Sequence, residues 1–364
     1  MRAAGTPRDA NAPVSRGAKL APLSSGQSPM SASSPWIRIV SRDNGVGLSR
    51  DMAIMADALH AYGHVDSVGF GSGGAGKALL QARLAMEGRW RGPADVQVFS
   101  ERVYPRCLPL ARHNLLVPNP EWFLDKWRPL LPAFERVLCK TRHAERLFAG
   151  LGCRTDYIGF TSEDRLQAQV PRRPAFFHLA GRSRAKGTRV LLDTWLGHPE
   201  WPMLTVVQHP RMAEVPVRAA NIDHRIAYLD DAELRTLQNA HLFHICPSEA
   251  EGYGHYLMEA MSVGAIVLTT RAEPMTELVP PGLGIHIPVQ RVREEGMVPR
   301  HYVAPVGIER AVEAALGMDE ARRVDCSSGA RRHFLEARGQ FLARFQAVVD
   351  EVVHSAVVTG NRAA

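Results

Sequence analysis

The 364-residue sequence is poor in cysteine and has no long apolar run. Its five cysteines are scattered and form no CxxC pair, so neither a zinc knuckle nor a disulfide framework is indicated. A reducing cytoplasm is therefore the expected location. No apolar run approaches the roughly 20 residues that a membrane helix needs, and we expect no transmembrane segment.

Signatures of several enzyme classes are also missing. The 15 histidines include no H-E-x-x-H zinc motif, and no nucleophile elbow of a serine hydrolase occurs. The acidic pair Asp230-Asp231 stands where a helix is expected to begin, so capping is its expected role rather than metal binding. The sequence predicts no metal site.

Charge of one sign is only slightly in excess. The chain has 44 Lys+Arg against 37 Asp+Glu, a formal net charge of +7. This balance is typical of a soluble basic protein whose field attracts anionic substrates, and a nucleic-acid-binding protein is the alternative. With 45% hydrophobic residues, a chain of this length can bury a core without disulfides or metals.

Composition divides the chain into four parts. Residues 1–35 are rich in Ser, Ala, Pro and Gly, cannot bury enough apolar surface to order themselves, and are predicted to be a disordered leader. Two folded domains are expected, over 36–160 and 172–329. A helix over 330–355 is expected to end the chain, where it can cross back to the first domain.

Hydrophobic periodicity predicts alternating strands and helices. Such alternation is typical of an α/β fold with parallel sheets and helices on both faces. Strands are expected at 36–41, 96–99, 114–117, 136–140, 175–180, 204–208, 225–228, 241–246 and 265–269, and helices at 49–61, 143–149, 186–196, 230–240 and 255–263.

The most informative run is CPSEAEGYGHYLMEAM at 246–261, between an expected buried strand and an expected helix. In a parallel sheet that junction lies at the carboxyl end, where ligands bind. Gly252 and Gly254 let a ligand approach the backbone, and the free amides of the helix start favour a phosphate. Glu251 and Glu259 flank this anion site and suit sugar hydroxyls. A capping and a solvated glutamate are the alternative.

Glu251 and Glu259 have the E-x7-E spacing of retaining GT-B glycosyltransferases of the group 1 type, and Gly264 and Glu277 resemble that family too. The resemblance implies a GT-B fold, in which two Rossmann-like parallel-sheet domains face a cleft. The acceptor-side domain would be 36–160, and the nucleotide-sugar-binding domain would be 172–329. It further implies that Glu251 orients the donor sugar and Glu259 holds the ribose hydroxyls. The same resemblance assigns donor contacts to Gly252, Tyr253, Gly254, His255, Tyr256 and Leu257.

A second segment, LAGRSRAKG at 179–187, resembles the Gly-Arg…Lys-Gly element of the same family. The resemblance implies that Arg182 and Lys186 neutralise the donor diphosphate, Arg with a forked contact and Lys with a point charge. Arg184 competes for the Arg182 role, and a solvated basic loop is the alternative for the segment. Because the protein supplies these cations itself, we expect a metal-independent reaction.

Two glycine loops are weaker signals. Gly45 and Gly47 are candidate donor contacts or a plain tight turn, and Arg50 stands where a dinucleotide fingerprint needs its third glycine. The run 71–77 matches G-x4-G-K of a P-loop. However, Ala78 replaces the Ser or Thr that would hold magnesium, and a mobile glycine loop is the alternative.

The loop over 117–123, with its prolines, resembles a cleft loop. Trp122 is suited to stack on a sugar or base, or else belongs to the core. No catalytic base is assigned there.

Together these patterns predict a retaining, metal-independent glycosyltransferase, with retention resting on the family resemblance alone. It would move a sugar from a nucleotide-diphosphate sugar of unidentified base to an unidentified acceptor, which is a glycan, lipid, protein or nucleic acid. No cofactor is expected beyond this donor substrate. The alternatives are a GT-B-fold epimerase or phosphorylase, a basic nucleic-acid-binding protein with a degenerate sugar-nucleotide domain, and a P-loop NTPase.

Overall fold

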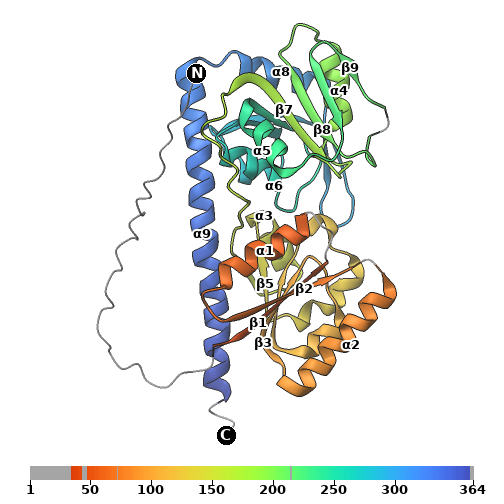
Figure 1. Cartoon of the computed structure of the whole chain (residues 1–364), viewed down its shortest axis with the longest axis vertical. Coiled ribbons are helices and arrows are strands. Elements are labelled where there is room, and N and C mark those ends of the chain that lie inside the picture. Colours follow the sequence, from red (N-terminus) through yellow and green to blue (C-terminus); the bar gives the residue numbers. More distant parts are fainter. Residues whose placement is uncertain (1–33, 43–46, 72, 214, 361–364) are drawn as a thin grey trace, which may run out of the picture. The chain divides into compact units, whose positions relative to one another are not determined.

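The computed structural model describes residues 34–42, 47–71, 73–213 and 215–360 (Figure 1). Residues 1–33 of the predicted leader lie outside this part of the chain. Two parallel sheets follow one another along the sequence, each flanked by helices, and the predicted α/β fold is confirmed.

The first sheet has six parallel strands in the order β2-β1-β3-β4-β5-β6. Alternate residues of its central strands enter two different cores: Ile37 and Ile39 pack in one cluster and Val40 in another. This is the two-residue period of a strand buried on both faces. The elements are β1 Trp36–Arg42, α1 Gly47–Leu59, β2 His64–Phe70, α2 Gly74–Arg91, β3 Ala94–Ser100, β4 Ala111–Val117, β5 Arg136–Cys139, α3 Arg142–Gly150 and β6 Thr155–Tyr157, with 3-10 helices η1 Pro105–Leu110, η2 Pro120–Trp122 and η3 Asp125–Ala133.

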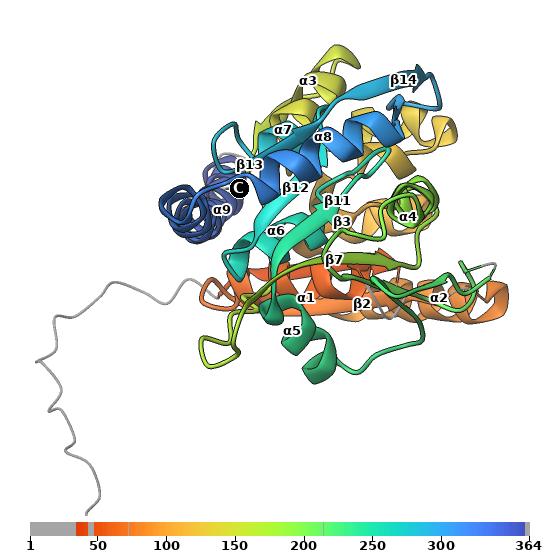
Figure 2. The same ribbon diagram turned by 90° about the horizontal axis from the view of Figure 1, so that it is seen from above.

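The second sheet has seven strands in the order β13-β12-β11-β7-β8-β10-β9, all parallel except the short β9. Helices α4 and α8 pack on one face, and α5 and α6 lie on the other (Figure 2). The elements are β7 Arg173–Gly181, α4 Thr188–Leu196, β8 Leu204–Gln208, β9 Arg218–Ala219, β10 Ile222–Ile226, α5 Asp231–Ala240, β11 His241–Cys246, α6 His255–Ser262, β12 Ile266–Thr270, α7 Met275–Leu278, β13 Gly284–Ile287 and α8 Pro305–Leu316, with a separate hairpin of β14 Val289–Arg293 and β15 Arg300–Val303.

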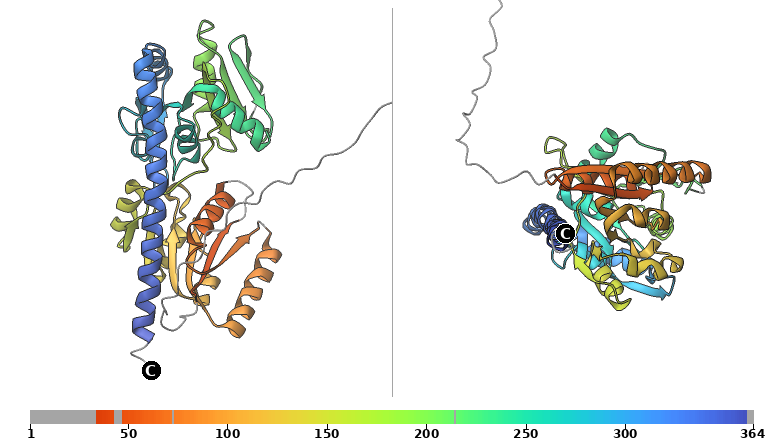
Figure 3. Two further views of the ribbon diagram at one scale, coloured as in Figure 1. Left: turned by 60° about the vertical axis from the view of Figure 1, so that its left-hand side comes forward. Right: turned by 90° about the horizontal axis from the view of Figure 1, so that it is seen from below.

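Helix α9, Glu320–Gly360, runs along both halves of the fold (Figure 3). Near its start the hydroxyl of Ser327 donates to the carbonyl of Gly264. Near its end Gln346 donates to the carbonyl of Ala58 at 2.7 Å, and Glu351 forms an ion pair with Arg136. The helix begins well before the predicted start at 330, so that boundary is corrected.

Candidate functional site

A cavity of about 500 Å³ lies at the carboxyl ends of strands from both sheets. Its lining residues follow β4, β5, β7, β8, β10 and β11 or stand in the first turns of α1. This is the edge where open parallel sheets bind ligands. The predicted site residues in the lining are Arg182, Lys186, Glu251, Tyr253, Gly254, His255, Tyr256 and Glu259.

The loop after β7 is held against the end of β11. Gly187 has φ +64, and a Cβ at that position would come within 2.3 Å of the carbonyl oxygen of Pro247. The amide of Glu249 also donates to the carbonyl of Ala185 at 2.9 Å. This close approach, which only glycine permits, brings Lys186 into the cavity beside the run after β11.

Lys186 and Glu251 form an ion pair through Glu251 Oε1. The Lys186 ammonium also lies 3.7 Å from the centre of the Tyr256 ring, and Ser248 Oγ donates to Glu251 Oε1 at 2.5 Å. A cation for phosphate and an acceptor for hydroxyls therefore stand side by side.

Glu259 lies inside α6 with its side chain 2% exposed. One oxygen forms an ion pair with Arg50 of α1, and Gln238 Nε2 donates to Oε2 at 2.8 Å. Because each carboxylate oxygen has two lone pairs, both contacts leave room for a ligand hydroxyl.

The first residue of α6 joins a buried charge network. His255 Nε2 lies 2.5 Å from Asp51 Oδ1, and His255 Nδ1 lies 2.8 Å from Ser162 Oγ. Asp51 Oδ2 in turn accepts from Lys140 Nζ at 2.5 Å. Burial pushes the pKa of Asp51 up, but Lys140 and His255 outweigh it and lower that pKa to about 2. The network keeps a carboxylate charged at the amino end of α6.

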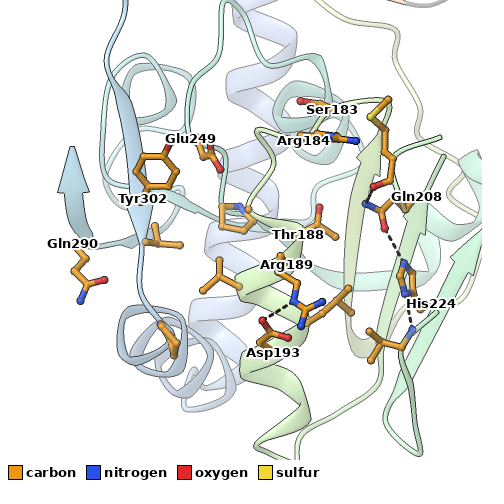
Figure 4. A pocket seen from close by; sticks show the side chains of 18 of the residues that line it. Ser183, Arg184, Thr188, Arg189, Asp193, Gln208, His224, Glu249, Gln290 and Tyr302 are labelled. Carbon is orange, nitrogen blue, oxygen red and sulfur yellow. Dashed lines mark hydrogen bonds and ion pairs between the residues drawn. The ribbon is translucent and has the colours of Figure 1, made fainter. Parts of the chain in front are cut away.

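Two alternatives left by the sequence can be compared with this geometry. Arg182 lines the cavity with Lys186, whereas Arg184 lines a second cavity of about 560 Å³ behind the same loop (Figure 4). Trp122 is 57% exposed and lines the first cavity, so it is not a core residue.

Some predicted residues lie apart from the cavity wall. The Leu257 side chain is fully buried in the core, and its amide donates to the carbonyl of Gly254 at 2.9 Å. Gly252 packs against the carboxyl group of Glu121, and Gly47 begins α1. Gly45 lies outside the described residues.

Glu277 is directed at another helix. Its carboxylate accepts from the amides of Arg142 at 2.6 Å and His143 at 3.1 Å, at the start of α3. These two contacts therefore cap α3, a helix that flanks the first sheet.

Sequence reasoning missed a group of polar lining residues from the first sheet: Arg50, Asp51, Asn119, Glu121 and Lys140. Lys140 directly follows β5 and Asn119 closely follows β4. Their positions after buried strands were the available signal. Tyr228, which is 73% exposed after β10, was missed as well.

The P-loop-like run lies at a strand-to-helix junction, between β2 and α2. However, β2 is an edge strand, and α2 already begins at Gly74. Gly76 and Lys77 thus lie within the helix, and Lys77 Nζ is 5.8 Å from the Tyr104 ring. Lys77 is not part of the cavity lining.

In the described part of the chain, no group of three or more His, Cys, Asp or Glu residues is arranged to hold a metal ion. None of the helices described there has the length and apolar character needed to cross a membrane.

Comparison with known proteins gives a family match to part of the chain and several solved structures with a similar fold. Residues 222–294 match the model of the family Glycosyl transferases group 1. No curated protein matches the chain. Among solved structures, a glycosyltransferase from Rickettsia africae has 14% identity and a TM-score of 0.65, with 89% of this chain and 99% of that chain covered.

HepE from Anabaena, solved with UDP and glucose, has 13% identity and a TM-score of 0.63 over 88% of this chain and 100% of that one. The Escherichia coli structure described as "Trehalose-6-phosphate … bound with UDP-2-fluoro glucose" has 10% identity and a TM-score of 0.61 over 87% and 99%. The chain covers 61% of the chain that it matches in the GtfA/B complex. At these identities the structures establish the GT-B fold.

The fold is that of the GT-B glycosyltransferases, and the predicted fold class is confirmed. The E-x7-E run from Glu251 to Glu259 lies within the segment 222–294 that is similar to the glycosyl transferases group 1 family.

Proposed function

We propose that this enzyme transfers a sugar from a nucleotide-diphosphate sugar to an acceptor hydroxyl, with retention and without a metal ion. The observation that supports it best is the pairing of Lys186 with Glu251 at the start of α6, inside a cavity of about 500 Å³. Retention rests on the E-x7-E resemblance.

In this proposal the donor diphosphate binds near the first amides of α6, where the helix dipole favours negative charge. The bond between the anomeric carbon and the donor phosphate breaks, and the acceptor oxygen bonds to that carbon. The hydroxyl proton goes to the leaving diphosphate. Lys186 and Arg182 stabilise the negative charge that grows on this group, as a metal ion does in other transferases.

In this proposal, other residues that line the cavity make the remaining contacts to the donor. Glu251 accepts a hydrogen bond from the transferring sugar, and Glu259 accepts from the ribose while it still contacts Arg50. The exposed ring of Tyr228 suits stacking on the base. Two of the similar structures contain UDP or a UDP sugar, so UDP sugars are the first donors to test.

The proposal is tested by calorimetry and turnover with UDP, GDP, ADP and CMP sugars, each with and without EDTA. We expect one sugar nucleotide to bind and to be cleaved, with activity kept in EDTA. Complete loss with EDTA would contradict the metal-free mechanism. Failure of every sugar nucleotide to bind, together with RNA or DNA affinity that falls steeply with salt, would favour the nucleic-acid-binding alternative.

Glu259→Ala is expected to weaken binding of the free nucleotide by about 1.5–3 kcal/mol, the value of a hydrogen bond to a charged group. Calorimetry measures the affinity, and a melting curve shows that the chain still folds. Arg50→Met is the matched control, because it removes the ion pair and keeps the carboxylate. An equal loss in both variants would assign the effect to the ion pair and exclude a ribose contact.

A further inference from the structure

A smaller cavity of about 190 Å³ adjoins the donor cavity. The two share Glu121, Trp122, Ser183, Lys186 and Glu251 as lining residues. Its other side is formed by the hairpin of β14 and β15, through Glu295 in the turn and Arg300. A molecule in this cavity would therefore lie next to Glu251, which we propose contacts the transferring sugar.

Trp122 is displayed on a fixed backbone. It ends the short helix η2, where its amide donates to the carbonyl of Asn119 at 3.1 Å, and the next residue, Phe123, is buried. The indole itself stays largely exposed at the edge of both cavities. A large exposed aromatic ring at a cavity offers a flat, rigid surface for binding the apolar face of a ligand.

Glu121 has an unused polar atom. Its Oε2 is buried and finds no hydrogen-bond partner among the described residues. Its carboxyl group lies against Gly252, where a Cβ would come within 2.4 Å of that oxygen. Burial first, and then Glu251 and Glu101, raise the pKa of Glu121 to about 8. A neutral carboxyl group can both donate to and accept from hydroxyls, and a ligand that pairs with it relieves the cost of the unpaired atom.

Each positively charged residue that lines the small cavity already forms an ion pair with a glutamate. These two cations are Lys186, paired with Glu251, and Arg300, 2.9 Å from Glu295 and 3.1 Å from Glu249. In the proposed reaction the donor diphosphate occupies Lys186, and Arg300 stays paired with Glu295 and Glu249, so a phosphorylated acceptor would meet three carboxyl groups and no available cation of this lining. A lipid chain would desolvate the same carboxyl groups without pairing them.

We propose that this cavity is the acceptor site and that the acceptor is an uncharged carbohydrate, which stacks one ring face on Trp122 and hydrogen-bonds to Glu121 through its hydroxyls. The assignment rests on the proposed sugar-transfer function. It adds the substrate class of the acceptor and the two residues that recognise it.

The test uses p-nitrophenyl glucoside, galactoside and mannoside as acceptors, with the donor that binds the parent protein. Trp122→Leu is compared with Trp90→Leu, since Trp90 is also highly exposed (86%) but lines neither cavity. We expect Trp122→Leu to raise the acceptor KM about tenfold or more, while the donor Kd stays within about threefold. Trp90→Leu should leave both near the parent values.

A second pair of variants tests the hydrogen bond. Glu121→Gln keeps a neutral donor and acceptor of the same size, so we expect an acceptor KM close to that of the parent. Glu121→Ala removes both and should raise this KM by about tenfold or more. Equal KM values in Glu121→Ala and the parent would exclude the hydrogen bond.

Three outcomes overturn the assignment. In the first, Trp122→Leu leaves the acceptor KM unchanged. In the second, the parent transfers to a long-chain alcohol, a serine peptide or an oligonucleotide and to none of the glycosides. In the third, no sugar nucleotide binds. This result would overturn the proposed sugar-transfer function and, because the acceptor site depends on that function, the acceptor site too. The donor Kd, measured separately, distinguishes this last case from the other two.

Discussion

Lys186→Ala is expected to lower turnover by about 10²–10³-fold, the cost of losing one group that stabilises charge developing in a transition state. The melting temperature should change much less, because the ion pair of Lys186 lies at the wall of an open cavity and not in a core. Steady-state kinetics and a melting curve on the same preparation check both expectations. Glu251→Ala should also lose most turnover, since it removes a contact to the transferring sugar.

Lys77→Ala is the matched control for Lys186→Ala. It removes the lysine of the P-loop-like run, which lies in the first turn of α2 and outside the cavity lining. We expect sugar-nucleotide turnover within a few-fold of the parent. Loss of activity in Lys77→Ala, with full activity in Lys186→Ala and Glu251→Ala, would refute the proposed site and require an ATPase assay of the P-loop alternative.

Lys140→Met is expected to destabilise the fold by about 3–5 kcal/mol, as when one partner of a buried ion pair is removed. Lys140 and Asp51 are 1% and 3% exposed, and the substitution leaves the buried Asp51 carboxylate without its lysine partner. Chemical denaturation at neutral pH measures the free energy of unfolding. A loss below about 1 kcal/mol, typical of an exposed pair, would contradict the assignment.

Asp51→Asn tests the same pair through pH. The folded-state pKa of Asp51, about 2, lies below the usual aspartate value of 3.8, so its charged form stabilises the fold above the higher value. That contribution is lost as the pH falls through about 2. The stability difference between the parent and Asp51→Asn should therefore shrink from about pH 5 to about pH 2. A difference that does not change across this range would exclude the carboxylate charge as its cause.

Elements whose side chains alternate between cores, or are buried along their length, could be predicted from the sequence. β1 and β11 are examples, because nearly every residue in them is buried. β2 could not be recognised because it is a half-exposed edge strand. The hairpin of β14 and β15 was missed because its charged sequence, VQRVR and RHYV, resembles a loop.

Only those residues of the candidate site that belong to the second sheet and its helices could be predicted from the sequence. The run from Glu251 to Glu259 is contiguous, so spacing and structural context were enough to locate it. The partner of Glu259 is Arg50, 209 positions away and on a helix of the other sheet. Spacing along the chain contains no information about such a pair, because the two groups meet only after both domains have folded. The same holds for His255 and Asp51, 204 positions apart.

The route of α9 matters for anyone who exchanges domains between proteins of this fold. Phe341, Phe345, Val349 and Val352, from the second half of this helix, are buried in one cluster with Ile37. Although these residues are encoded at the far end of the chain, they complete the core of the first sheet. A chimera that takes the half with the first sheet from another protein of this fold must therefore take the end of the C-terminal helix from the same parent. A crossover placed only between β6 and β7 would join two surfaces that were never selected to fit.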